Sequence, residues 1–199
     1  MFREIEKQIG VKRGLSMSTE KADKQSANPK YAPGNNYSIN CQTCAPAFML
    51  RRWGFNVTAK PNTAGSLSEY LSRGHFAETW TDLAGNGKNT VRFSDYMIAK
   101  GWKSMNKKRY YEYFNDVCKE DGIYELALRW KGSGGGHCTI VLKENGKLYY
   151  VEPQVDCTSS NRDFDWLIDN LSSSPRTHHG VVRIDNALLN MKFVSIFNK

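Results

Sequence analysis

The sequence predicts an α+β fold, with helices in the first part of the chain and an antiparallel sheet in the second. The stretch that ends at Gly54 mixes apolar and basic residues as a helix does, and glycine is the usual left-handed helix stop. Residues 123–130 alternate in the manner of a strand. Asn145-Gly146 is the dipeptide that most favours a two-residue hairpin turn. Helices followed by hairpin strands define the α+β class.

The chain has 199 residues, of which 40% are hydrophobic, and this suits one globular domain with its own core. We expect that domain at residues 36–199. Residues 1–35 are expected to form a basic N-terminal arm that is partly helical or disordered. Phe2, Ile5 and Ile9 recur at helical spacing in this arm, which predicts a short amphipathic helix there.

The remaining elements follow from periodicity and from glycine stops. The expected helices end at Gly54 and at Gly74, occupy residues 94–100 and 106–119, and run from a cap at Asn161 to Leu171. The expected strands are residues 55–59, 123–130, a strand that starts at His137, its hairpin partner after Asn145-Gly146, and residues 181–184 and 193–197.

The charge balance gives little support to nucleic-acid binding. The net charge is +8 and the sequence pI is about 9.2, but Lys and Arg are scattered along the chain. The densest cluster is residues 107–109, and a solvated helix face explains it better than a nucleic-acid patch. No apolar run approaches the roughly 20 residues of a membrane span, and the N-terminus lacks a signal-peptide core.

The five cysteines do not form the framework of a disulfide-rich protein, because their number is odd and they are spread along the chain. Cys41 and Cys44 have zinc-ligand spacing. A structural zinc site needs two more ligands, usually as a second close pair, and the chain has no second C-x-x-C. We therefore expect no metal, and nothing in the sequence indicates a cofactor.

The same two cysteines lie where a helix begins, and free N–H groups at a helix N-terminus favour a thiolate and an oxyanion. Pro46 lacks an N–H and is tolerated best in a first turn. This argument places Thr43 at the cap and Cys44 at the first helical position, with Cys41 in the preceding turn. It favours Cys44 as the nucleophile, and packing of both thiols is the alternative.

A histidine and an acid follow in the order that a cysteine hydrolase requires. His137 comes after three glycines at the start of a strand. A two-residue turn at Asn145-Gly146 pairs His137 with Gln154 and Thr139 with Glu152. Cross-strand partners share a face, so Glu152 can orient the imidazole. Gln154 can orient it too, or can donate to an oxyanion.

At these residues the sequence resembles the papain-fold toxin family, the Tox-PL or glutamine-deamidase-like group of bacterial polymorphic toxins, which also occurs in phage and mobile-element head proteins. The resemblance spans roughly residues 28 to 190. It rests on four segments: residues 40–44, residues 51–59, Gly136-His137 and residues 151–154, with residues 183–186 as a weaker match.

The resemblance implies a papain-like fold, with an N-terminal catalytic helix and a mainly antiparallel sheet, and a Cys-His-acid triad. It favours Cys41, the cysteine after Asn40, as the nucleophile, together with His137 and Glu152. The family's acid is usually Asp, and the longer Glu152 stands in its place here.

We therefore expect a cysteine hydrolase that acts on protein amides, most directly a glutamine deamidase of a toxin or effector. Peptide cleavage is the second hypothesis, and a non-catalytic phage or mobile-element module is the third. The expected partners are a protein substrate and an immunity protein or a particle partner, without a membrane or nucleic acid. The protein is expected in the cytoplasm, delivered to a target cell or packaged in a phage particle.

Overall fold

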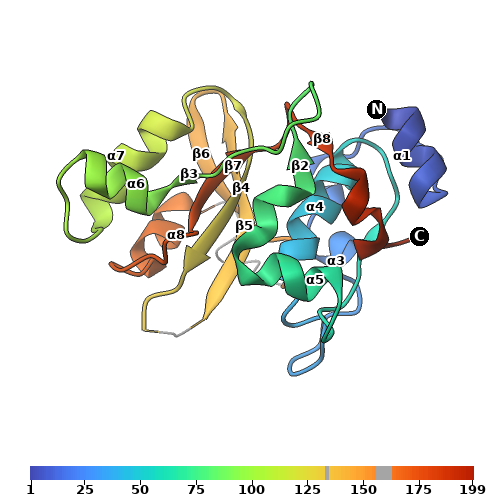
Figure 1. The fold of residues 1–199 in the computed structure, drawn as a ribbon, viewed down its shortest axis with the longest axis horizontal. Coiled ribbons are helices and arrows are strands. Elements are labelled where there is room, and N and C mark those ends of the chain that lie inside the picture. Colours follow the sequence, from blue (N-terminus) through green and yellow to red (C-terminus); the bar gives the residue numbers. More distant parts are fainter. Residues whose placement is uncertain (133–134, 156–162) are drawn as a thin grey trace. The chain divides into compact units, whose positions relative to one another are not determined.

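A five-stranded antiparallel sheet is the largest element of the computed structural model, which describes residues 1–132, 135–155 and 163–199 (Figure 1). Its strand order is β3-β7-β4-β5-β6. The strands are β3 (Val91–Arg92), β4 (Gly122–Arg129), β5 (Gly136–Glu144), β6 (Lys147–Val151) and β7 (Gly180–Arg183). The chain thus has the α+β class that its sequence predicts.

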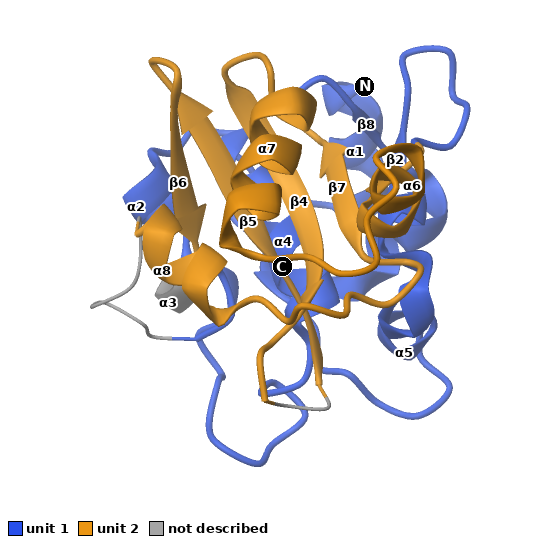
Figure 2. Cartoon of the chain, turned by 90° about the vertical axis from the view of Figure 1, so that its left-hand side faces the viewer, with its two compact units in different colours: residues 1–88, 152–157, 186–199 blue, residues 89–151, 158–185 orange. Residues whose placement is uncertain are grey.

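The described residues divide into two compact units (Figure 2). Unit 1 comprises residues 1–88, 152–157 and 186–199, and unit 2 comprises residues 89–151 and 158–185. The five-stranded sheet lies entirely in unit 2. Unit 1 holds two short sheets, in which β1 (Thr58–Ala59) pairs with β9 (Phe197–Asn198) and β2 (Trp80–Thr81) pairs with β8 (Leu188–Leu189). This division differs from the arm at 1–35 and the domain at 36–199 that the sequence suggests.

In unit 2, three helices lie on one face of the sheet (Figures 1 and 2). They are α6 (Phe93–Ala99), α7 (Lys107–Val117) and α8 (Phe164–Asn170). Phe93, Tyr113, Phe114 and Phe164 are buried between them, and neighbouring rings in this cluster have centroids 4.4 to 6.1 Å apart. Burial of these aromatic rings contributes to the stability of unit 2.

The β5–β6 hairpin follows the predicted register. Asn145 and Gly146 both have positive φ angles, 52° and 76°, as a type I′ turn requires. The ladder runs from the pair Glu144–Lys147 to the pair Ile140–Val151. The strand β6 ends there, so Glu152 and Gln154 lie beyond the ladder, and the predicted extension of the pairing to His137 is wrong.

Unit 1 is built mainly from helices. They are α1 (Phe2–Ile9), α2 (Thr19–Ala22), α3 (Lys24–Ala27), α4 (Cys41–Arg52) and α5 (Leu67–Tyr70), with shorter helical turns η1 (Leu71–His75), η2 (Phe76–Thr79) and η3 (Met191–Ile196). The short strands are β1 (Thr58–Ala59), β2 (Trp80–Thr81), β8 (Leu188–Leu189) and β9 (Phe197–Asn198).

The N-terminal segment packs into unit 1 instead of forming a separate arm. Ile5 and Ile9 of α1 are buried, and the Phe2 ring lies 5.7 Å from that of Trp53. The Arg13 guanidinium donates to the Trp53 carbonyl, and that of Arg52 donates to the Met17 carbonyl. These contacts attach the N-terminal segment to the end of α4. They join residues far apart in the sequence, so the local sequence pattern does not predict them.

Several other sequence predictions differ from the structure. Residues 193–197 were expected to be a strand, but they fall mostly in the helical turn η3 because Asn190 caps it. The expected strand at 55–59 is reduced to the two residues of β1. The expected cap Asn161 lies outside the described residues, and α8 is capped by the Asp163 side chain. No described helix has the length and apolar character that crossing a membrane demands.

Candidate functional site

Cys41 is the first residue of α4, and Asn40 is its N-cap. The backbone carbonyl of Asn40 accepts hydrogen bonds from the Thr43 and Cys44 N–H groups at 2.9 and 3.2 Å. The predicted start, with Thr43 as the cap and Cys44 as the first helical residue, is therefore wrong. Pro46 is tolerated inside the helix because the single bond it removes belongs to the Gln42 carbonyl in the first turn.

The two thiols of this helix have different environments. Cys44 is 0% exposed, and its Sγ donates to Asn40 Oδ1 at 3.2 Å. Burial raises the pKa of the Cys44 thiol well above its usual value near 9, and the charges of Cys41 and Glu152 raise it further. Cys41 is partly exposed. Of the two, Cys41 is the thiol that a reagent or a substrate can reach.

The side chain of Gln42 supports Cys41 from a buried position. The Cys41 Sγ donates to Gln42 Oε1 at 3.4 Å. The amide nitrogen of Gln42 donates to the Ser68 carbonyl at 2.9 Å and to the Ser68 hydroxyl at 2.8 Å. Since these bonds use both amide hydrogens, Gln42 orients the thiol and does not offer its side chain to an oxyanion.

Gln154 caps the start of α4. One terminal atom of its amide lies 2.9 Å from the Cys41 nitrogen and 3.0 Å from the Asn40 nitrogen. Because both nitrogens are donors, we assign this atom as the amide oxygen. It also lies 3.2 Å from Asn40 Oδ1, and two donors outweigh this one acceptor. The side chain thus presents its oxygen, not its N–H groups, to the helix, unlike the predicted oxyanion donor.

Two asparagines connect these groups into a buried polar network. Asn28 donates to the Tyr37 carbonyl at 2.9 Å and to the Gln154 carbonyl at 3.0 Å. The Asn40 amide donates to Asn28 Oδ1 at 3.1 Å and to the Lys60 carbonyl at 2.9 Å. Satisfied buried amides of this kind hold a single geometry, because any displacement leaves a buried polar group without its partner.

Glu152 is also part of unit 1, and it is buried, at 1% exposure. Its Oε1 accepts from the backbone N–H of Gln154 at 2.9 Å, which fixes the turn that presents the Gln154 side chain to α4. Because the Gln154 side chain contacts the Cys41 nitrogen, this hydrogen bond connects Glu152 to the start of α4 through Gln154. The structure therefore brings three of the predicted residues together in unit 1: Cys41, Glu152 and Gln154.

His137 lies in unit 2, on strand β5 opposite Leu128 of β4. Its ring centroid is 5.5 Å from that of Trp130, at an interplanar angle of 30°. Trp130 contacts Trp166 of α8, which stacks on Tyr150. The imidazole thus belongs to an aromatic row on the face of the sheet that α8 covers. Because Cys41 and His137 belong to different units, their pairing stays a prediction.

A second histidine–carboxylate pair was missed in the sequence. In unit 1, His75 Nδ1 lies 2.8 Å from Glu78 Oε1, and the His75 ring stacks on Tyr70 with centroids 4.2 Å apart. The Tyr70 hydroxyl donates to the same carboxylate, which raises the pKa of Tyr70. The spacing of three residues between His75 and Glu78 in a helical segment was the available signal.

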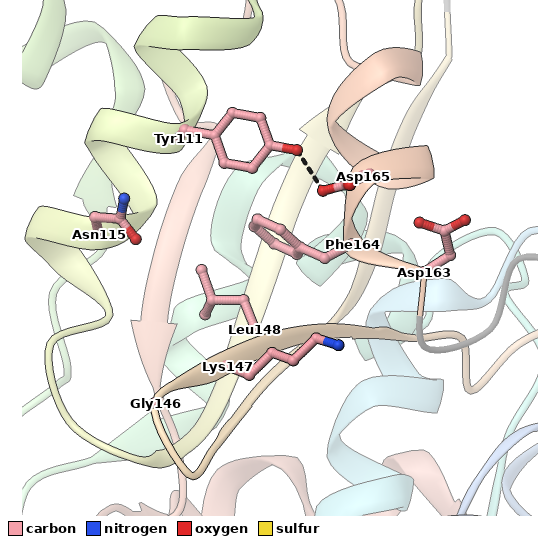
Figure 3. A pocket seen from close by; sticks show the side chains of 8 residues that line it. All are labelled: Tyr111, Asn115, Gly146, Lys147, Leu148, Asp163, Phe164 and Asp165. Carbon is pink, nitrogen blue, oxygen red and sulfur yellow. Dashed lines mark hydrogen bonds between the residues drawn. The ribbon is translucent and has the colours of Figure 1, made fainter.

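Unit 2 contains a pocket that none of these residues lines. The pocket has a volume of about 500 Å³ and is lined by α7, the β5–β6 turn and the start of α8 (Figure 3). Within it, the Tyr111 hydroxyl donates to Asp165, as Figure 3 shows. Within residues 1–132, 135–155 and 163–199, no cluster of three metal-ligating side chains is present.

Comparison with known proteins identified no relatives. No protein-family model matches the chain, and no curated protein or solved structure shows significant similarity to it.

Proposed function

We propose that this protein is a papain-like cysteine hydrolase that acts on protein amides, with Cys41 as its nucleophile. The observation that carries the proposal is the position of Cys41, a partly exposed thiol at the first residue of α4, held by Gln42 above a buried network of amides. A structural cysteine does not need this support, since it packs as a small apolar residue.

The start of α4 supplies what the nucleophile requires. The helix dipole favours negative charge on a thiolate at the first helical residue. The backbone N–H of Gln42, at the second helical position, has no acceptor within the helix and can stabilise an oxyanion. The Cys41 N–H already donates to the Gln154 oxygen at 2.9 Å.

In the proposed reaction, His137 takes the proton of the Cys41 thiol, the thiolate attacks the amide carbonyl, and the oxyanion forms at the Gln42 N–H. His137 then gives a proton to the departing amine or ammonia, which leaves a thioester. Water, deprotonated by His137, cleaves the thioester and restores the thiol. Glu152 is proposed to orient His137. The family resemblance favours the side-chain amide of glutamine as the substrate group, so that ammonia leaves.

Alkylation kinetics test the nucleophile and its base. Wild-type protein, His137→Ala and His75→Ala would be treated with iodoacetamide between pH 5 and pH 9, and the adducts located by mass spectrometry. We expect fast labelling of Cys41 at neutral pH that slows in His137→Ala and not in His75→Ala. Slow labelling of Cys41 in all three proteins would refute the proposal. Slower labelling in His75→Ala alone would identify His75, and not His137, as the base.

The products distinguish the two amide reactions. Incubation with a mixture of unfolded proteins should release ammonia and convert glutamine to glutamate, without new N-termini. New N-termini without ammonia would establish a protease instead. Cys41→Ser is the control, because it removes the thiol and should abolish either product.

A further inference from the structure

Cys41 and Cys44 occupy positions one and four of α4, one helical turn apart. Side chains three residues apart lie on the same helix face, with Cβ atoms about 5–6 Å apart. A disulfide needs Cα atoms about 4.4–6.8 Å apart and Cβ atoms about 3.5–4.5 Å apart. The two Cβ atoms must therefore approach each other by about 1–2 Å, which a change in the first turn of the helix can supply.

The environments of the two thiols differ, because one is accessible to an oxidant and the other is buried. Cys41 is partly exposed and lies at the helix N-terminus, where a thiolate is favoured and an oxidant has access. Cys44 is buried directly beneath this turn and is held by Asn40 as a thiol. An oxidant reaches the first sulfur, and only a neighbouring group reaches the second.

We propose that Cys41 and Cys44 form a reversible redox site, in which Cys44 resolves oxidised Cys41 as an intramolecular disulfide. The site requires no substrate and no histidine, so it stands independently of the hydrolase proposal. If Cys41 is also the nucleophile, the disulfide protects it from irreversible oxidation and switches it off until it is reduced.

The oxidant is a hydroperoxide. The Cys41 thiolate attacks the peroxide oxygen, the O–O bond breaks, and Cys41 becomes a sulfenic acid while the leaving oxygen takes up the proton that the thiol released and departs as an alcohol or water. The Cys44 sulfur then attacks the Cys41 sulfur. The S–O bond breaks, the S–S bond forms, and the Cys44 proton leaves with the hydroxyl group as water. A dithiol reverses the reaction by thiol–disulfide exchange.

The first turn of α4 can accommodate this change. Pro46 removes the hydrogen bond that would tie the Gln42 carbonyl into the helix, so the turn between the two cysteines is restrained by fewer bonds. Disulfide formation gives up the Cys41–Gln42 and Cys44–Asn40 hydrogen bonds, both weak because they involve thiols. The Asn28 amide nitrogen lies 3.3 Å from Asn40 Oδ1, but its two hydrogens also serve the Tyr37 and Gln154 carbonyls, so Asn40 Oδ1 can only share one of them.

Peptide mapping tests the proposal directly. Trypsin should release residues 31–51, a peptide that contains Cys41 and Cys44 and no other cysteine. After treatment of the wild-type protein with hydrogen peroxide at neutral pH, we expect this peptide to lose two hydrogen atoms. It should take up iodoacetamide only after reduction with dithiothreitol.

Cysteine variants test whether Cys44 is the residue that forms the disulfide with oxidised Cys41. Cys44→Ser keeps a hydroxyl donor for Asn40 and should trap the sulfenic acid, so that Cys41 reacts with dimedone and then proceeds to sulfinic acid. Cys118→Ser, which removes a buried thiol of unit 2, should behave like the wild type. A wild-type protein in which Cys41 accumulates as sulfinic acid, or pairs with Cys157 or another chain, would overturn the proposal even if Cys44→Ser failed to fold.

Discussion

The Cys41 thiol lies 3.4 Å from Oε1 of Gln42, whose amide nitrogen bonds to the carbonyl and hydroxyl of Ser68. Gln42 and Ser68 are both buried. The hydrogen bonds therefore run from a partly exposed sulfur into the interior of unit 1. Because the inner end is fixed, the outer end presents the thiol in one orientation.

Replacement of Gln42 by Met should destabilise the protein by about 1–3 kcal/mol, because it leaves the buried Ser68 groups without their donor. Urea denaturation measures this loss. Gln8→Met is the matched control, since Gln8 is an exposed glutamine bonded to Glu4 on α1, and its loss should cost less than about 0.5 kcal/mol. Equal stability of the two variants would show that Ser68 does not depend on Gln42.

The buried thiols predict a loss of stability in alkali. Burial raises the pKa of Cys118 from 9.0 to about 12. The unfolded chain releases this proton near pH 9, while the folded protein retains it. The resulting stability is complete below pH 9 and is lost as the pH rises from 9 towards 12. Urea denaturation at pH 8 and pH 10.5 should show a smaller decrease in the free energy of unfolding for Cys118→Ala than for the wild type. Identical decreases would show that the Cys118 thiol does not contribute to this loss.

The sequence predicts the sheet of unit 2 well because its signals are local. The Asn145-Gly146 turn fixes the hairpin register, and the observed ladder keeps that register to Val151. Where β6 ends is not a local property. The Thr139 hydroxyl bonds to the Val151 carbonyl, and the next residues turn towards α4, where Glu152 and Gln154 find buried partners far away in the sequence.

The start of α4 shows the opposite case, in which a sound local rule gives the wrong answer. The preference of proline for a first turn placed the cap at Thr43. In the structure, Asn40 is the better cap because its carbonyl accepts from Thr43 and Cys44 while its side chain is fixed by Asn28 and Lys60. These tertiary hydrogen bonds outweigh the one bond that Pro46 removes. The prediction that Cys41 is the nucleophile comes from the family resemblance and not from this rule.

His179 predicts a loss of stability in acid. Its ring is buried, and Nδ1 accepts from the Arg176 N–H at 3.1 Å. Burial, together with the positive charges of the nearby His178, Arg176 and Arg129, lowers the pKa of His179 from 6.5 to about 3. The stability this contributes is complete above pH 6.5 and is lost as the pH falls towards 3, because only the unfolded chain takes up the proton.

His179→Gln should therefore reduce the dependence of stability on pH between 6.5 and 4, as measured by urea denaturation at several pH values. His75→Gln is the control, since His75 is only partly buried and lies beside Glu78. A wild-type protein whose stability did not change over this range, or a His179→Gln variant with the same slope as wild type, would exclude the buried neutral imidazole.

Trp130 should position His137 for catalysis. The ring centroids of Trp130 and His137 lie 5.5 Å apart, and the Trp130 ring also contacts that of Trp166. Trp130→Ala removes one wall of the imidazole and should lower the rate of ammonia release by about 10- to 100-fold, as expected when a catalytic group loses its orientation. Trp130→Phe, which keeps a flat ring, should restore most of the rate. Trp102→Ala is the matched control, because Trp102 is a tryptophan of unit 2 that packs on Tyr96 instead. Equal losses in Trp130→Ala and Trp102→Ala, with no rescue by Phe, would assign Trp130 to the stability of unit 2 alone.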